Sequence, residues 1–181
     1  MAKWVALLRG INVSGHRPIR MAELRSWMEE LGLDKVATYI QSGNIVFSAQ
    51  DRSAGRLAQR IRAQILTHSG FDVPVVLRSA ARMSSIAKAN PFPAEAAREG
   101  KNVSVLFLSG KPKADGLVAL SEVDSGDDQF EAIGKEIYVL CPNGAARTKL
   151  LSGSALRKLG VDATGRNWKT VMKLNEMLAE L

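Results

Sequence analysis

The spacing of apolar residues in the first 90 positions predicts alternating strands and helices. Continuous apolar runs are typical of strands buried on both faces, whereas apolar residues three and four apart indicate the buried side of a helix. The predicted elements are, in order, a strand at 4–8, a helix at 21–31, a hairpin of strands at 36–40 and 45–47, a helix at 53–68, a strand at 73–77 and a short helix at 80–89. The first six follow the order of a split βαβ, or ferredoxin-like, unit.

The pattern begins again after a proline-rich break at 90–93. We expect an α+β fold of two ferredoxin-like (βαββαβ) halves, with residues 1–90 as the first, 91–101 as a linker and 102–181 as the second. The second half is expected to be degenerate, with its last strand missing or reduced to 161–163. Its other predicted elements are a strand at 103–108, a helix at 112–120, strands at 129–133 and 137–141, a helix at 154–159 and a C-terminal amphipathic helix at 168–181.

Three polar stretches stand between the predicted elements. They are Arg9–Gly15, Gln41–Asn44 and Thr164–Trp168, and each sets amide, hydroxyl or guanidinium side chains around a glycine. Glycine and asparagine tolerate positive φ, so the middle stretch is also typical of a hairpin turn. We expect the three stretches to converge on one ligand-binding site. Its predicted residues are Arg9, Gly10, Asn12, Ser42, Gly43, Asn44, Arg166 and Asn167.

Contact between the first two stretches follows from the predicted topology. The first and third strands of a split βαβ unit are central, antiparallel neighbours, so the end of one lies beside the start of the other. Asn12 should therefore contact the turn at Gln41–Asn44. Placing Arg166 and Asn167 at the same site rests on their matching composition and on the following helix, which needs a surface to cover. The first turn of that helix also leaves N–H donors that attract anions. Asn167 is also a candidate N-cap for that helix.

The formal net charge of +7 favours an anionic partner over a neutral one. Residues 1–90 hold 13 basic and 6 acidic side chains, and residues 141–181 hold 7 and 3, so both basic portions contain the polar stretches. A basic surface that only faces solvent is the alternative. Platforms on which bases could stack are not visible, because most aromatic residues stand at core spacing. We therefore expect nucleic acid to be at most a weak, sequence-indifferent partner.

Several kinds of chemistry are disfavoured. Gly10–Gly15 has the glycine spacing of a P-loop, but His16 and Arg17 stand where the phosphate-binding lysine and the magnesium-binding hydroxyl are needed. His16 has no carboxylate nearby in sequence to orient it for acid–base work. The lone cysteine, Cys141, ends an apolar run and is expected to be a buried thiol. We expect no metal, no cofactor and no membrane span, and a cytoplasmic location.

Four motifs together resemble one protein family. They are Ala6–Val13 (A-L-L-R-G-I-N-V), Met21–Leu24 (M-A-E-L), Thr38–Asn44 (T-Y-I-Q-S-G-N) and Arg166–Trp168 (R-N-W) with Val171, Lys173 and Leu174. On these residues the chain resembles the bacterial domain-of-unknown-function family numbered 1697. The resemblance implies a two-part α+β architecture with ferredoxin-like halves, and it implies no activity. Ser14 and His16 depart from the family pattern, which counts against His16 as a catalytic residue.

These features favour a binding module for a phosphate- or carboxylate-bearing ligand. Arg9 and Arg166 would neutralise the charge of the ligand, and the amide and hydroxyl side chains would fix its orientation. An enzyme of unknown class that uses the same pocket is the alternative. A protein whose polar loops only hold two halves together is a third possibility.

A double-mutant cycle tests whether the polar stretches share one site. Arg9→Ala and Arg166→Ala should each cost about 1–3 kcal/mol of ligand binding or stability, with non-additive losses in the double variant. Ligand titration and denaturant unfolding measure both quantities. Strict additivity would contradict a shared site.

Overall fold

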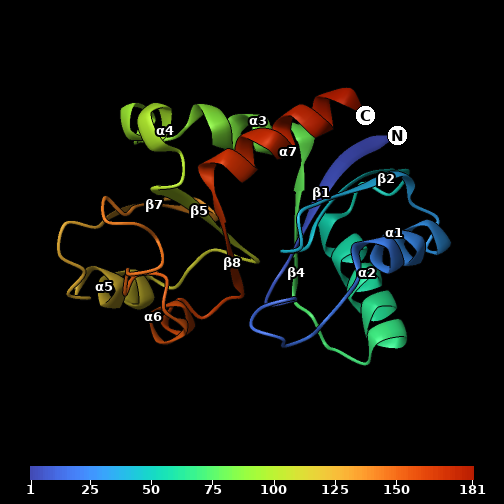
Figure 1. The fold of residues 1–181 in the computed structure, drawn as a ribbon, viewed down its shortest axis with the longest axis horizontal. Coiled ribbons are helices and arrows are strands. Elements are labelled where there is room, and N and C mark those ends of the chain that lie inside the picture. The colour runs from blue at the N-terminus through green and yellow to red at the C-terminus, as the bar shows by residue number, and fades with distance from the viewer. The chain divides into compact units, whose positions relative to one another are not determined.

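The computed structural model describes residues 1–181 and divides the chain into two compact units. Unit 1 comprises Met1–Ser85 and Lys173–Leu181, and unit 2 comprises Ile86–Met172. Each unit contains one four-stranded antiparallel sheet with helices packed on it (Figure 1). The predicted α+β fold of two ferredoxin-like halves is confirmed.

The elements of unit 1 follow the predicted order closely. They are β1 (Ala2–Leu8), α1 (Met21–Glu30), β2 (Asp34–Tyr39), β3 (Asn44–Ala49), α2 (Ala54–Ser69) and β4 (Val75–Ser79), after which α3 (Ala80–Lys88) begins. The sheet has the strand order β2-β3-β1-β4, with β1 and β3 at its centre. The ends of α2 match the sequence signals, because the Ser53 hydroxyl caps its start and Gly70, at a φ of 74°, ends it.

The core of unit 1 lies between the sheet and the helices α1 and α2, which lie on the same side of the sheet in Figure 1. Alternate residues of the central strands, such as Leu8 and Phe47, point toward these helices. Leu24 of α1 and Ile61 of α2 are fully buried against them. This packing fixes which face of each strand points to the core, and so fixes the register in which the strands pair.

Unit 2 repeats this arrangement with smaller helices. Its elements are α4 (Pro93–Glu99), β5 (Val103–Leu108), α5 (Ala114–Ser121), β6 (Gln129–Ile133), β7 (Glu136–Leu140), α6 (Gly153–Lys158) and β8 (Ala163–Asn167), and α7 (Trp168–Glu180) begins in unit 2 and ends in unit 1. The strand order β6-β7-β5-β8 is that of unit 1. The helices α5 and α6 have 8 and 6 residues, against 10 and 16 in α1 and α2. The second half is therefore reduced in its helices.

The last strand of unit 2 is present, contrary to the expectation that it is missing or reduced to 161–163. β8 pairs antiparallel with β5, from Ala163 opposite Leu108 to Asn167 opposite Ser104. Its sequence, A-T-G-R-N, has low strand propensity, so its own residues do not indicate a strand. Pairing with the buried strand β5 supplies the hydrogen bonds that hold it extended.

Residues 93–99 of the expected linker form the helix α4. Pro93 stands in the first turn of this helix, where the missing N–H of proline costs nothing. The prolines at 91 and 93 indicate an interruption of regular secondary structure, but in the structure the second proline begins a helix. The division of the chain into domains at 91–101 stays a prediction.

Gly43 should tolerate a side chain much less well than Gly15, although both have a φ of +79°. A Cβ on Gly43 would lie 2.6 Å from Leu8 Cβ, whereas a Cβ on Gly15 would meet nothing within 4 Å. Gly15→Ala should cost about 1 kcal/mol for left-handed strain, and Gly43→Ala about 1–3 kcal/mol more for overpacking. Urea unfolding of the two variants measures the difference. Equal losses would contradict the tight packing of the turn on β1.

Candidate functional site

The loop between β1 and α1 and the turn between β2 and β3 meet at one end of the unit 1 sheet. β1 and β3 are antiparallel, and Leu7 lies opposite Asn44. The Leu8 backbone N–H donates to the Gly43 carbonyl at 2.8 Å. Ile11 of the loop also packs on the turn, since its Cδ1 lies 2.9 Å from the point where a Gly43 Cβ would be. The first two polar stretches are therefore neighbours, as the topology predicted.

Asn12 holds the two loops together with its side chain. Its Nδ2 donates to the Ile19 carbonyl and to the Gln41 carbonyl, both at 2.9 Å, and its Oδ1 accepts the Ile19 N–H at 2.8 Å. The predicted contact of Asn12 with the Gln41–Asn44 turn is confirmed. Because both ends of the amide are bonded within the protein, Asn12 positions the loops.

The side chains of the β2–β3 turn also bond within the turn. Asn44 is fully buried, and its Nδ2 donates to the Tyr39 carbonyl at 2.9 Å and to the Ser42 hydroxyl at 3.0 Å. Gly43 is buried beside it in the left-handed region. These three predicted site residues lie together at the start of β3, where they determine the shape of the turn.

Backbone strain is concentrated in this pair of loops. Five residues other than glycine have positive φ, and four of them lie here: Asn12 (53°), Ser14 (49°), Arg17 (48°) and Ile40 (48°). Gly10, Gly15 and Gly43 add three left-handed glycines to the same region. A left-handed conformation costs roughly 1–2 kcal/mol for a residue with a Cβ, most of all for a β-branched one. The contacts of Asn12 and Gly43 hold the loops in this costly shape.

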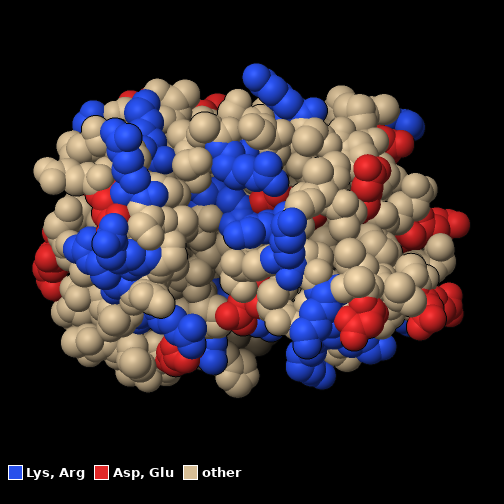
Figure 2. Space-filling model, turned by 180° about the vertical axis from the view of Figure 1, so that it is seen from behind, with Lys and Arg blue, Asp and Glu red and all other residues tan.

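Positive charge is concentrated on the β1–α1 loop, which contains three arginines and no acidic residue of its own, although the charge of Arg17 acts on Asp72. Residues 9–20 contain Arg9, Arg17 and Arg20, and the first carboxylate along the chain is that of Glu23, 3.9 Å from Arg20. Arg9 is half-buried and its backbone N–H donates to the Pro74 carbonyl at 3.1 Å, whereas Arg17 and Arg20 are exposed. Other Lys and Arg side chains form groups on the face drawn in Figure 2, so positive charge extends beyond this loop.

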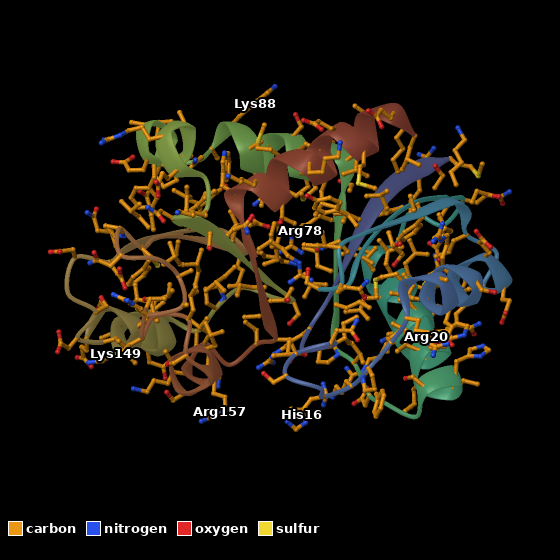
Figure 3. The ribbon with its side chains drawn as sticks, viewed as in Figure 1. His16, Arg20, Arg78, Lys88, Lys149 and Arg157 are labelled. Carbon is orange, nitrogen blue, oxygen red and sulfur yellow. The ribbon has the colours of Figure 1, made fainter.

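His16 lies at the outer edge of the β1–α1 loop, where Figure 3 shows it projecting from the chain. Its side chain is exposed, and its backbone N–H donates to the Val13 carbonyl at 2.8 Å. The loop also departs from a P-loop in its geometry, because α1 begins only at Met21, well after Gly15. The arrangement around His16 is that of a surface residue.

The third polar stretch is a strand end instead of a loop. Arg166 in β8 is 7% exposed, and its Nη1 donates to the Thr164 hydroxyl at 2.8 Å and to the Gly165 carbonyl at 2.7 Å. Burial lowers the pKa of the Arg166 guanidinium to about 10, so the group stays charged at neutral pH. Asn167 Oδ1 accepts the Thr170 N–H at 2.9 Å, in the first turn of α7, which confirms the predicted cap.

Arg166 and Asn167 belong to unit 2, and their part in a site with the unit 1 loops stays a prediction.

Arg78, which none of the sequence patterns singled out, is the counterpart of Arg166 in unit 1. Arg78 lies in β4 opposite Val5, and Arg166 lies in β8 opposite Val105, which is the equivalent position of the second sheet. The two arginines are 8% and 7% exposed. Each donates from Nη1 to the carbonyl of the residue before it, at 2.8 Å for Arg78 and 2.7 Å for Arg166. Figure 3 shows Arg78 on the side of the sheet away from α1 and α2.

The residue after each buried arginine caps the next helix. The Ser79 hydroxyl accepts the Arg82 N–H at 3.2 Å at the start of α3, as Asn167 does for α7. The two units thus share a strand end in which a buried arginine precedes a helix cap. An arginine inside an otherwise apolar strand, one residue before a helix cap, is the signal in the sequence that could have identified Arg78.

The lone thiol is not built for nucleophilic attack. Cys141 is fully buried, and burial, with a smaller effect of the Asp128 charge, raises the pKa of its thiol to about 11. The thiol is therefore protonated at neutral pH, and the predicted buried cysteine is confirmed. No group of three or more His, Cys, Asp or Glu side chains could hold a metal ion. None of the helices combines the length and the hydropathy that a membrane crossing requires.

Comparisons with known proteins agree with the architecture. The chain is similar to a solved structure described as that of a conserved bacterial protein, SP0830, from Streptococcus pneumoniae, with 29% identity over 98% of each chain and a TM-score of 0.78. No similar protein was found among the curated proteins. The family described as "Protein of unknown function (DUF1697)" matches residues 1–138. This match covers more than half of the chain and agrees with the resemblance of its motifs, so the protein belongs to the DUF1697 family.

Proposed function

We propose that the two loops at the end of β1 bind a small anionic ligand that carries a phosphate or carboxylate group. The observation that carries this proposal is the concentration of left-handed residues, since four of the five non-glycine examples lie in these loops. Strained backbone persists only where surrounding contacts hold it, and it is concentrated at binding and catalytic sites. A loop that is held in shape before its ligand arrives loses little entropy on binding.

An anion would contact a charged side chain and backbone amides of the β1–α1 loop. Arg17 places an exposed guanidinium group beside the exposed Ser14 and Gly15, and Arg9 stands at the start of the same loop. The amides of Ser14 and Gly15 take no part in the hydrogen bonds that hold the loop, so they can donate to an anion. Guanidinium groups bind phosphate and carboxylate through charge-assisted hydrogen bonds. Asn12 and Asn44 then act as positioning residues behind these contacts.

Titration with inorganic phosphate, followed by NMR of the backbone amides, tests this proposal. Phosphate should shift the amide signals of Ser14 and Gly15 and saturate in the millimolar range. Arg17→Ala should weaken binding about 3–10-fold, because an exposed charge-assisted contact contributes roughly 1 kcal/mol. Arg9→Ala should weaken it at least as much, since Arg9 is half-buried.

Arg52→Ala is the matched control, because Arg52 is an exposed arginine of the same unit outside the two loops. It should leave phosphate affinity unchanged at fixed ionic strength. Equal losses of phosphate affinity in Arg17→Ala and Arg52→Ala would show that only the net charge of the protein matters, and would contradict a binding site in these loops. Salt-sensitive binding of a single-stranded oligonucleotide, with no phosphate shift at Ser14 and Gly15, would favour nucleic acid instead.

Removing the Asn12 side chain should release both loops at once. Asn12→Ala deletes three hydrogen bonds and should destabilise the protein by about 1–3 kcal/mol while weakening phosphate binding. Amide exchange at Ile19 should accelerate, because its N–H loses the Asn12 acceptor. Asn143→Ala, at an exposed asparagine of unit 2, is the control for unfolding by urea. Unchanged exchange at Ile19 would contradict the positioning role.

A further inference from the structure

Two exposed apolar side chains stand beside the loop contact made by Asn12. Val13 is 57% exposed and Ile40 is 49% exposed, and the chain has only six large apolar side chains with such exposure. Val13 follows Asn12 in sequence and Ile40 precedes Gln41, so the hydrogen bond from Asn12 to Gln41 brings their backbones together. Single exposed apolar residues need no explanation, but two at the same strained contact do.

Ile40 is the more informative of the two, because its backbone is left-handed at a φ of 48°. β-Branched residues rarely take this conformation, and glycine or asparagine would take it at lower cost. Burial of its side chain in the core cannot be the reason for Ile40, since about half of the side chain faces solvent. The position therefore combines a backbone cost with an apolar surface that the folded chain does not use.

Positive charge and apolar surface thus meet on one pair of loops. Arg17 and Arg9 lie on the same loop as Val13, and the exposed residues Ser14 and Gly15 lie between Val13 and Arg17 in the chain. A simple inorganic anion would use the charged groups and leave Val13 and Ile40 in water. A ligand with an apolar group next to its charge would use both.

We infer that the ligand of these loops is an amphipathic anion, in which an apolar or aromatic group adjoins a phosphate or carboxylate. This inference rests on the proposed anion binding and adds the class of ligand to it. Val13 and Ile40 are the specificity-determining residues, and they contact the apolar group while the arginines and backbone amides hold the charge. Binding of the ligand covers the exposed side chain of Ile40, and this contact explains why a costly backbone conformation carries an apolar residue.

Phenyl phosphate and methyl phosphate are the probes, because both are phosphate monoesters and differ mainly in apolar area. Phenyl phosphate should bind about tenfold more tightly than methyl phosphate in NMR or calorimetric titrations at pH 8. Val13→Ser and Ile40→Asn should each reduce this preference to about threefold or less while leaving methyl phosphate affinity within twofold. Val118→Ser, at an exposed valine of unit 2, should leave the preference unchanged.

A second readout separates a role in binding from a role in folding. Asparagine tolerates the left-handed region, so Ile40→Asn should raise Tm by about 2–4 °C while it lowers the preference for phenyl phosphate. A fall in Tm would show that Ile40 is needed for folding and would overturn the inference. So would a preference for phenyl phosphate that survives in both Val13→Ser and Ile40→Asn.

The outcomes also distinguish this inference from the proposed function. Equal affinity for the two monoesters, with shifts at Ser14 and Gly15, would overturn the amphipathic ligand and leave anion binding in place. Absence of binding by both monoesters and by inorganic phosphate would overturn anion binding and the inference with it.

Discussion

The antiparallel pairing of the first and third strands at the centre of each sheet is the constraint on which the rest depends. In unit 1 it sets Leu7 opposite Asn44, and in unit 2 it sets Phe107 opposite Glu136. The pairing forces the loop after the first strand to lie beside the hairpin turn before the third. The contact between the two loops of the candidate site follows from it, because Asn12 reaches Gln41 only when these two chain segments share one end of the sheet.

The two units resemble each other most in a feature that costs free energy. Burying a guanidinium group is unfavourable unless hydrogen bonds to the protein replace those to water. The chain nevertheless buries an arginine at equivalent positions in β4 and β8. In both units the arginine bonds to the carbonyl before it, and the next residue caps a helix. This arrangement joins the edge strand to the following helix without a loop. It is a more specific likeness than strand order, which any ferredoxin-like unit shares.

Polar side chains in the loops of unit 1 turn out to have two distinct roles. The side chains of Asn12, Ser42 and Asn44 form hydrogen bonds within the protein, and these bonds stabilise the left-handed backbone of the loops. The exposed groups of the same loops are arginines, backbone amides and two apolar side chains. A strained loop that internal hydrogen bonds hold in shape, and whose other groups face solvent, has the general form of a pre-organised binding surface.

The sequence by itself determined the elements whose patterns are local. Apolar runs at 4–8 and 103–108 located β1 and β5, the cap at Ser53 and the glycine at 70 located the ends of α2, and the split βαβ order was enough to place Asn12 beside Gln41–Asn44. Only the tertiary structure decided the rest. β8 is a strand because β5 supplies hydrogen bonds to its backbone, although the sequence of β8 itself has low strand propensity. Asn12 and Asn44 were predicted as ligand contacts, but the folded loops bond their amides to the carbonyls of Gln41 and Tyr39, because the shape of the loops decides which carbonyl each amide meets.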